Sequence, residues 1–387
     1  MRKYVSIALV LLAVSTLFSC GEKAPEGEFI VKGKLTDVPD STIVTLYRTE
    51  GNIGTSVAFD TLINGEFYFH DTITTAPRKF DISLSGAANS FARRDFFVAP
   101  RSITNITGSD VNMMFWNFDN DLKEQQEFDK YHAVRMPEYG DSFTVYGEMI
   151  DLWEQPRTDE TKLKLDSLGS LRMSLYSAAG LKHLEYMKVA PVSEIWLDEY
   201  HSLVQLLQYE PNSPNVPAIK ALYERMTEAD KLTSVGVKIT EYMNLPVPVK
   251  VGDAMVDGVL YDTLGKKRSL SEFKGDYILL DFFSQWCGPC LSSIPELEEL
   301  KKTYADKLSV VAISEDPIDK WKSFIERKNL KGNQFNELRG ARTGLWAHYG
   351  VSGIPHYVLI APDGMVQSIW TGYGPGSLKQ KLAEELK

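Results

Sequence analysis

The N-terminal part of the chain consists of short apolar runs separated by turn residues. Between residues 28 and 118 the runs are rich in β-branched and aromatic side chains, as at 42–47 and 80–84, and this composition is typical of strands. Asn64-Gly65 lies before one such run, and this pair favours a tight hairpin turn because both residues tolerate a positive φ. The regular spacing of the runs predicts a small antiparallel β-sandwich domain over residues 28–118.

Residues 119–245 follow a different pattern, in which apolar positions recur three or four residues apart in long charged stretches. One charged stretch opens with Thr158-Asp159-Glu160. Leucines follow it at largely helical spacing: Leu163, Leu165, Leu168, Leu171 and Leu175. A leucine stripe of this kind packs against neighbouring elements far more often than it binds a ligand. The pattern predicts an all-α middle region, interpreted as a spacer, which ends at Pro246-Val247-Pro248.

From residue 246 to residue 387 the pattern predicts an α/β domain. The run at 277–283 is apolar throughout except for Asp281, and continuous apolar runs are typical of strands buried on both faces of a sheet. The segment 316–330 carries apolar residues at helical spacing. These residues are Trp321, Phe324 and Ile325.

The first 19 residues have the pattern of a signal peptide. A positively charged start precedes an apolar run that ends at residue 18, which is too short for a membrane-spanning helix of about 20 residues. The run leads into Leu17-Phe18-Ser19-Cys20, which resembles a bacterial lipobox and implies cleavage after residue 19 and lipidation of Cys20. Several acyl chains would anchor the protein stably to a membrane, and residues 20–27 would form a tether. The alternative is an ordinary secretory signal with a coincidental cysteine.

The overall composition limits the classes of protein to consider. Hydrophobic residues make up 43% of the chain and charged residues 24%, which excludes a mostly disordered, collagenous or polytopic membrane protein. The net charge of −10 provides no basic surface for nucleic acid. Three cysteines in 387 residues are too few for a scaffold built on disulfides, so each cysteine needs its own explanation.

The other two cysteines, Cys287 and Cys290, enclose a Gly-Pro pair and closely follow the buried run. A Cys-x-x-Cys motif between a strand and a helix is typical of a redox pair, because the helix N-terminus favours the thiolate of the first cysteine. The alternatives are half of a zinc site and a structural disulfide. Zinc needs four ligands and no third cysteine lies nearby, while a disulfide across two residues stabilises little. We therefore predict a redox-active disulfide, without metal or cofactor.

Residues 249–387, with this motif, closely resemble the thioredoxins. The resemblance implies a thioredoxin-like fold in which Cys287 attacks a partner disulfide and Cys290 resolves the mixed disulfide. It also implies that Asp281 acts through water to deprotonate Cys290, and burial should raise the pKa of this carboxyl group. The alternative for Asp281 is a structural hydrogen bond at the end of a strand.

The resemblance extends to the substrate-binding side of the site. Pro355 matches the cis-proline that faces the cysteines in thioredoxins, and this geometry would expose the backbone of Ile354 for β-like pairing with a substrate segment. Trp286 is an aromatic residue next to the nucleophile and is expected to contact the partner. Simple packing is the alternative for Trp286.

Two further segments narrow the family. The extension at 251–275 and the insertion at 316–330 are similar to those of TlpA/ResA-like envelope enzymes. Two residues depart from that branch: Asp281, where the branch often has another residue, and Ser293, where it commonly has Glu. Residues 28–118 resemble a domain of unknown function that precedes thioredoxin domains in Gram-negative lipoproteins. The peroxidase motif Pro-x-x-x-Thr-x-x-Cys is absent from the stretch before the cysteines.

These observations predict an envelope thiol–disulfide oxidoreductase that is lipid-anchored to a membrane, with its redox domain in the periplasm. We expect it to reduce protein disulfides and, by resemblance, to receive electrons from a membrane donor of the DsbD/CcdA kind. Two alternatives stay open. One is a thiol peroxidase of the AhpC/TSA type, and the other is a lipid-anchored binding or adaptor protein with a secondary redox domain.

Overall fold

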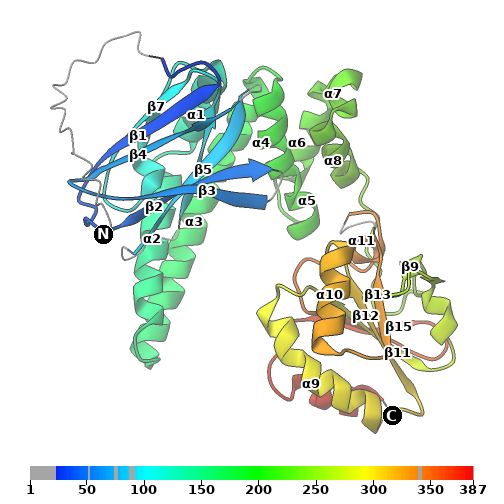
Figure 1. Cartoon of the computed structure of the whole chain (residues 1–387). Helices are drawn as coiled ribbons and strands as arrows, with labels where there is room; N and C mark the ends of the chain where they lie inside the picture. Colours follow the sequence, from blue (N-terminus) through cyan, green and yellow to red (C-terminus); the bar gives the residue numbers. More distant parts are fainter. Residues whose placement is uncertain (1–22, 51–52, 74–76, 87–91, 339–341, 387) are drawn as a thin grey trace, which may run out of the picture. The chain divides into compact units, whose positions relative to one another are not determined.

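The computed structural model divides the chain into two compact units, the first ending at Ala190 and the second beginning at Pro191 (Figure 1). It describes residues 23–386 except 51–52, 74–76, 87–91 and 339–341. The predicted signal peptide and Cys20 therefore lie outside the described residues. Among the described helices, none combines the length and the apolar composition needed to cross a bilayer.

The first unit begins with two four-stranded sheets, ordered β4-β1-β7-β8 and β3-β2-β5-β6. The strands are β1 (Glu28–Thr36), β2 (Ile43–Glu50), β3 (Ile53–Thr61), β4 (Glu66–Thr72), β5 (Arg78–Ser85), β6 (Arg93–Val98), β7 (Ile103–Ser109) and β8 (Asn117–Asp119). Buried side chains from both sheets form one core. In this core the rings of Phe29 and Phe80 pack edge to face, with their centroids 5.1 Å apart. The predicted sandwich is confirmed with one difference. β1 and β7 pair in parallel, which is possible because no hairpin links them.

The Asn64-Gly65 pair forms the predicted tight turn between β3 and β4. Both residues have positive φ, at 53° and 74°, and the flanking Ile63 and Glu66 exchange backbone hydrogen bonds of 3.2 and 3.0 Å. A Cβ atom at Gly65 would lie 2.2 Å from the carbonyl oxygen of Leu35, so this position requires glycine. Because β3 and β4 belong to different sheets, the turn carries the chain from one sheet to the other.

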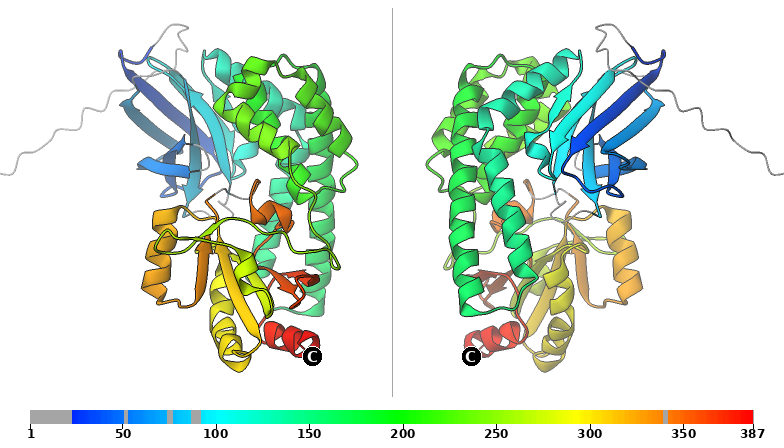
Figure 2. Two further views of the ribbon diagram at one scale, coloured as in Figure 1. Left: turned by 90° about the vertical axis from the view of Figure 1, so that its right-hand side faces the viewer. Right: turned by 90° about the vertical axis from the view of Figure 1, so that its left-hand side faces the viewer.

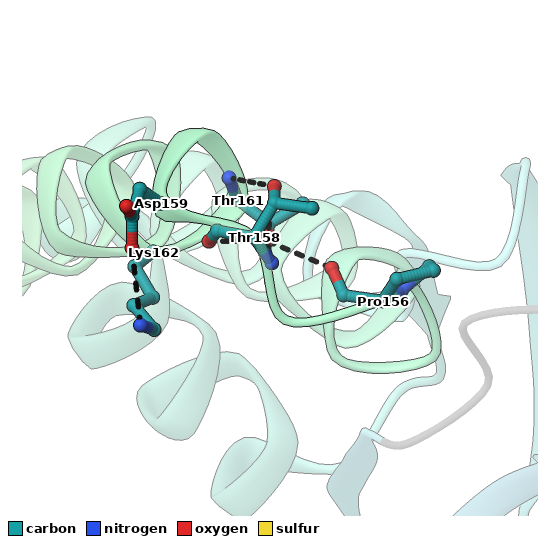
Figure 3. Close-up of polar contacts among 5 residues, drawn as sticks. All are labelled: Pro156, Thr158, Asp159, Thr161 and Lys162. Atoms are coloured by element: carbon teal, nitrogen blue, oxygen red, sulfur yellow. Dashed lines mark hydrogen bonds and ion pairs between the residues drawn. The ribbon is translucent and has the colours of Figure 1, made fainter.

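Three helices complete the first unit: α1 (Lys123–Arg135), α2 (Glu138–Trp153) and α3 (Asp159–Val189). Helix α3 begins with a reciprocal cap, in which the Thr158 hydroxyl accepts the backbone N–H of Thr161 at 3.2 Å and the Thr161 hydroxyl accepts that of Thr158 at 2.8 Å. Figure 3 shows this reciprocal cap. It satisfies two backbone donors that a helix N-terminus otherwise leaves unpaired.

The packing expected for the leucines of α3 is only partly right. Leu165, Leu168 and Leu175 are partly buried, but the side chains of Leu163 and Leu171 are 71% and 48% exposed. Residues two positions apart, such as Leu163 and Leu165, lie on nearly opposite sides of a helix. One neighbouring helix therefore cannot cover the whole stripe.

The second unit begins with five helices: α4 (Glu194–Val204), α5 (Leu206–Tyr209), α6 (Val216–Ala221), α7 (Glu228–Leu232) and α8 (Ser234–Met243). The helical region predicted for residues 119–245 is thus divided between the two units. Arg342 links α8 to the α/β part, since its Nε donates to Glu241 Oε2 at 2.8 Å. Short 3-10 helices cover Met113–Phe115, Leu222–Arg225 and Leu270–Phe273.

The α/β part contains one seven-stranded sheet in the order β10-β9-β13-β12-β11-β14-β15. Its strands are β9 (Leu260–Tyr261), β10 (Lys267–Arg268), β11 (Tyr277–Phe283), β12 (Leu308–Ser314), β13 (Asn333–Asn336), β14 (His356–Ile360) and β15 (Val366–Thr371), and its helices are α9 (Gly288–Thr303), α10 (Ile318–Lys328), α11 (Leu345–His348) and α12 (Ser377–Glu385). The predicted central strand is β11, which is parallel to β12 and antiparallel to β14. The thioredoxin-like fold predicted for this part is confirmed.

Helices α9 and α12 pack on one face of this sheet, where their leucines share a core with Leu279, Tyr357 and Leu359. Figure 2 shows α12, in red, beside α9, in yellow. Helix α10 covers the same face near Phe283 and Ala312. It coincides with the helical pattern expected within 316–330. Alternate residues of β11 therefore face α9, and Asp281 is one of them.

Candidate active site

The cysteine pair lies where β11 passes into α9. Cys287 is the N-cap residue of the helix, and its Sγ accepts the backbone N–H of Cys290 at 3.2 Å. Pro289 fits the first turn because a backbone N–H there would be unpaired. The two cysteines are joined by a disulfide. Cys287 is partly exposed, whereas Cys290 is only 2% exposed, so a partner molecule can reach the first sulfur and not the second.

The segment containing Ile354 and Pro355 approaches the disulfide from the other side. The Ile354–Pro355 peptide bond is cis, and the carbonyl oxygen of Ile354 lies 3.6 Å from Cys287 Sγ. The structure therefore places this segment opposite the cysteines, as the resemblance to thioredoxins implied. Pairing of the Ile354 backbone with a substrate stays a prediction.

Trp286, next to the nucleophile, exposes a large apolar surface. Its side chain is 75% exposed, while its backbone N–H donates to Ser284 Oγ at 3.2 Å. The loop is therefore held through its backbone and leaves the indole ring free to contact a partner.

Asp316 is a part of the site that the sequence analysis missed. Its carboxylate accepts hydrogen bonds from the Ser284 hydroxyl at 2.7 Å and from the backbone N–H of Gln285 at 2.8 Å. Its own carbonyl oxygen accepts from Asn336 Nδ2 at 2.8 Å. Asp316 follows β12 just as Ser284 follows β11, and parallel neighbours end at the same edge of a sheet. That topological rule is the signal that could have identified it.

Asp281 lies on the face of β11 that α9 covers, together with Leu279. Its side chain is 5% exposed. Burial raises the pKa of its carboxyl group to about 7, although the positive charge of Lys301 acts in the opposite direction. The expected raised pKa is thus confirmed in direction and in cause. A carboxyl group with this pKa exchanges protons readily near neutral pH.

Two other buried groups lie between α9 and the face of the sheet that carries Asp281. Tyr357 of β14 pairs in register with Asp281. Ser293, one turn after Cys290, is fully buried and donates through Oγ to the Cys290 carbonyl oxygen at 2.8 Å. Within the described part of the chain, no three His, Cys, Asp or Glu side chains form a group that could hold a metal ion.

Comparison with known proteins places this site in a family. Residues 251–369, which include the cysteine pair, match the AhpC/TSA family. The chain is 30% identical over 131 residues to the thioredoxin-like protein YneN of Bacillus subtilis, covering 34% of this chain and 77% of YneN. It is also 30% identical over 148 residues to the thiol-disulfide oxidoreductase ResA of Bacillus cereus, covering 38% of this chain and 82% of ResA. The chain belongs to the ResA-like family of thiol–disulfide oxidoreductases.

Membership of this family identifies the chain as an enzyme. Among solved structures, it is similar to a thiol-disulfide oxidoreductase from Bacteroides fragilis, with 25% identity, a TM-score of 0.32, and coverage of 34% of this chain and 99% of that one. Of the residues predicted from the sequence, the structure brings Cys287, Cys290 and Ile354 together, with Cys287 partly exposed and Cys290 buried, while Asp281 lies on the neighbouring strand β11. In this ResA-like chain, the structure adds Asp316 and Tyr357 to the candidate site residues that the sequence predicted.

Proposed function

We propose that the protein reduces disulfide bonds of other proteins through Cys287 and Cys290. The observation that carries this proposal is the position of Cys287 Sγ, which is partly exposed at the N-terminus of α9 and accepts a backbone N–H. Such a position stabilises a thiolate and lowers the pKa of a cysteine. The buried Cys290 lies within disulfide-bonding reach of it.

The reaction begins with the pair in its dithiol form. The Cys287 thiolate attacks one sulfur of the partner disulfide, the partner S–S bond breaks, and the leaving sulfur takes up a proton. Asp281 then accepts the proton of the Cys290 thiol, and the resulting thiolate attacks Cys287 Sγ. The second partner sulfur leaves as a thiolate and is protonated in turn. Two electrons have passed to the partner, and the Cys287–Cys290 disulfide is the oxidised product.

A trapping experiment tests this function. The Cys290→Ser variant should accumulate a mixed disulfide between Cys287 and its partner, and the Cys287→Ser variant should not. The trapped partners, released by reduction and identified by mass spectrometry, would give the substrates. A Cys290→Ser variant that forms no mixed disulfide in envelope extracts would argue against the proposal.

The direction of electron flow has its own measurement. A reductant should have a reduction potential near that of thioredoxin, about −270 mV, and a value near about −120 mV would indicate an oxidant instead. In an oxidising compartment a reductase must be recharged, so the proposal includes a membrane dithiol donor of the DsbD/CcdA kind. Deleting such a donor should leave Cys287 and Cys290 oxidised in cells.

We also propose that lipidated Cys20 anchors the enzyme, with the redox domain in the periplasm. The support is the lipobox-like sequence that ends at Cys20. A Cys20→Ala variant should lose its lipid and leave the membrane fraction, whereas Ser19→Ala should keep both. Membrane association of Cys20→Ala would contradict the anchor.

A thiol peroxidase is the second candidate, and the match of residues 251–369 to the AhpC/TSA family favours it. In that reaction the dithiol reduces a peroxide to an alcohol and water and becomes the disulfide. Consumption of hydrogen peroxide by the reduced enzyme, abolished in Cys287→Ser, would support this activity. The absence of a Pro-x-x-x-Thr-x-x-Cys motif before the cysteines makes the disulfide reductase our first choice.

A further inference from the structure

Asp281 and Tyr357 face each other across two adjacent strands, on the sheet face that α9 covers. They are direct partners in the antiparallel register of β11 and β14, and the Cβ atoms of such partners lie about 4.5–5.5 Å apart on the same face. That face is covered by α9 and α12, whose leucines pack beside Tyr357. Both residues are buried, so the carboxyl and phenol groups share one solvent-excluded layer.

Both groups have hydrogen-bonding capacity that their neighbours do not fully use. Among the described residues, no group lies within 3.5 Å and in hydrogen-bonding geometry of Asp281 Oδ1 or of the Tyr357 hydroxyl, so these two atoms are not bonded to each other in this structure, and a weaker polar contact with Ser293 is the nearest interaction of the Tyr357 hydroxyl. Such orphaned buried groups are uncommon, because each one costs desolvation free energy. Ser293, next to Tyr357, already donates its hydroxyl proton to the Cys290 carbonyl oxygen. The Tyr357 O–H is therefore a donor available to an Asp281 carboxylate.

The charges around this pair favour a neutral tyrosine. Burial and the nearby Asp281 raise the pKa of Tyr357, while Ser293 lowers it. The positive charge of Lys301, on α9, lowers the pKa of Asp281. Lys301 Nζ also forms an ion pair with Glu298 Oε1 at 2.7 Å. Tyr357 is thus a permanent hydrogen-bond donor at physiological pH, whereas Asp281 changes its charge there.

The other titratable groups near Tyr357 are occupied elsewhere. Glu296 of α9 accepts hydrogen bonds from the Tyr373 hydroxyl and from the backbone of α12. The ring of Tyr357 stacks on that of Trp370 of β15, with centroids 5.4 Å apart. This stacking restricts the ring that carries the hydroxyl.

We propose that Tyr357 is a positioning residue for Asp281, donating its O–H to the carboxylate whenever Asp281 is ionised. The inference rests on the proposed dithiol–disulfide exchange. When Cys290 attacks the mixed disulfide, its thiol proton passes to the Asp281 carboxylate, and Tyr357 keeps its own proton throughout. Because the donor stabilises only the ionised form of Asp281, Tyr357 determines the pH range in which Cys290 resolves the mixed disulfide.

The test is the pH dependence of one step in the Tyr357→Phe variant of the full chain. Reduced protein is mixed with a peptide that contains one intramolecular disulfide, and alkylation followed by mass spectrometry separates formation of the mixed disulfide from its resolution. Loss of the donor should move the pH midpoint of resolution upward by about one unit, which lowers the rate about tenfold below the midpoint. Formation of the mixed disulfide by Cys287 should be unchanged.

Two further variants separate this role from packing. Trp370→Phe alters the ring that stacks on Tyr357 but keeps the Tyr357 hydroxyl. The pH midpoint of resolution in this variant should therefore match that of the wild type. In an Asp281→Asn background, Tyr357→Phe should have no further effect on the profile. An unchanged or lowered midpoint in Tyr357→Phe, or an equal shift in the Asp281→Asn background, would overturn the inference while leaving the reductase intact. A wild-type protein that forms no mixed disulfide would instead refute the proposed function itself.

Discussion

Glu296 of α9 holds the N-terminus of α12 through Lys379, whose backbone N–H donates to Glu296 Oε1 at 2.7 Å. Glu296 Oε2 accepts two more hydrogen bonds of 2.9 Å, from the Gly376 backbone and the Tyr373 hydroxyl. Burial opposes ionisation of Glu296, but these bonds hold its pKa below the usual range. One carboxylate thus fastens the helix that carries the cysteines to the last helix of the domain.

Glu296→Gln should destabilise the second unit by about 1–3 kcal/mol at pH 7, because it replaces a charged acceptor of three hydrogen bonds. Denaturant unfolding measures this difference. Since the folded pKa of Glu296 is lowered, its contribution is present at neutral pH and is lost as the pH falls through that value. Glu299→Gln is the matched control. Glu299 pairs with Lys379 Nζ at an exposed position, so its loss should cost less than about 1 kcal/mol.

Asp281→Asn should stabilise the protein at pH 8 and impair its catalysis. Burial raises the pKa of Asp281 to about 7, from 3.8, so the folded state holds this proton more tightly than the unfolded state and stability falls as the pH rises between those values. Removing the carboxylate should recover a few kcal/mol at pH 8, on the order of 1.4 kcal/mol for each pH unit by which the pKa is raised, and almost nothing at pH 4. Thermal unfolding at both pH values checks the sign, and equal stability at pH 8 would contradict it.

Asp316→Ala should slow the attack of Cys287 about tenfold, because misplacement of a reacting group by about 1 Å is enough for losses of that size or larger. The substitution removes the acceptor of Ser284 and of the Gln285 backbone, two residues that lead into Trp286 and Cys287. Stopped-flow oxidation of the reduced enzyme by a disulfide peptide measures the rate. Asp316→Asn keeps one acceptor oxygen and should lie between wild type and Asp316→Ala. If Asp316→Ala matched the wild-type rate, the loop would not depend on this residue.

His356 should make the protein acid-sensitive. Burial lowers the pKa of this side chain to about 4, and its Nδ1 lies 2.8 Å from the Thr371 hydroxyl. Because the unfolded state binds the proton at its ordinary pKa of about 6.5, stability should fall as the pH drops from 6.5 towards 4, by about 3 kcal/mol in total. His356→Leu should lose this part of the pH dependence. An unchanged slope of unfolding free energy against pH in the variant would show that His356 is not its source.

Local sequence patterns predict much of this fold. The continuous apolar run identifies β11, the charged stretch that opens at Thr158 identifies α3, and the Cys-x-x-Cys motif identifies the beginning of α9. In each case neighbours in the sequence are also neighbours in space. The same holds for Asp281, because a carboxylate within an otherwise apolar strand is unfavourable and is recognisable from the residues on either side of it.

The residues that escaped prediction make their contacts across the sheet. Asp316 reaches Ser284 only because β11 and β12 end at one edge, and Tyr357 meets Asp281 only through the register of β14. Neither relationship has a local pattern. The exposed leucines of α3 show the same limit, since helical spacing predicts an apolar stripe but not how many neighbours will cover it.

Ser293 keeps a further carboxyl group out of the buried position next to Tyr357. Its hydroxyl is bound to the turn of its own helix, whereas a glutamate at this position would put a second carboxyl group next to Asp281 and Tyr357. Two such groups would titrate as a coupled pair, with two macroscopic steps that belong to neither residue alone. With serine there, Asp281 has no such coupled carboxyl partner at residue 293, and its protonation is not split into two steps by that position.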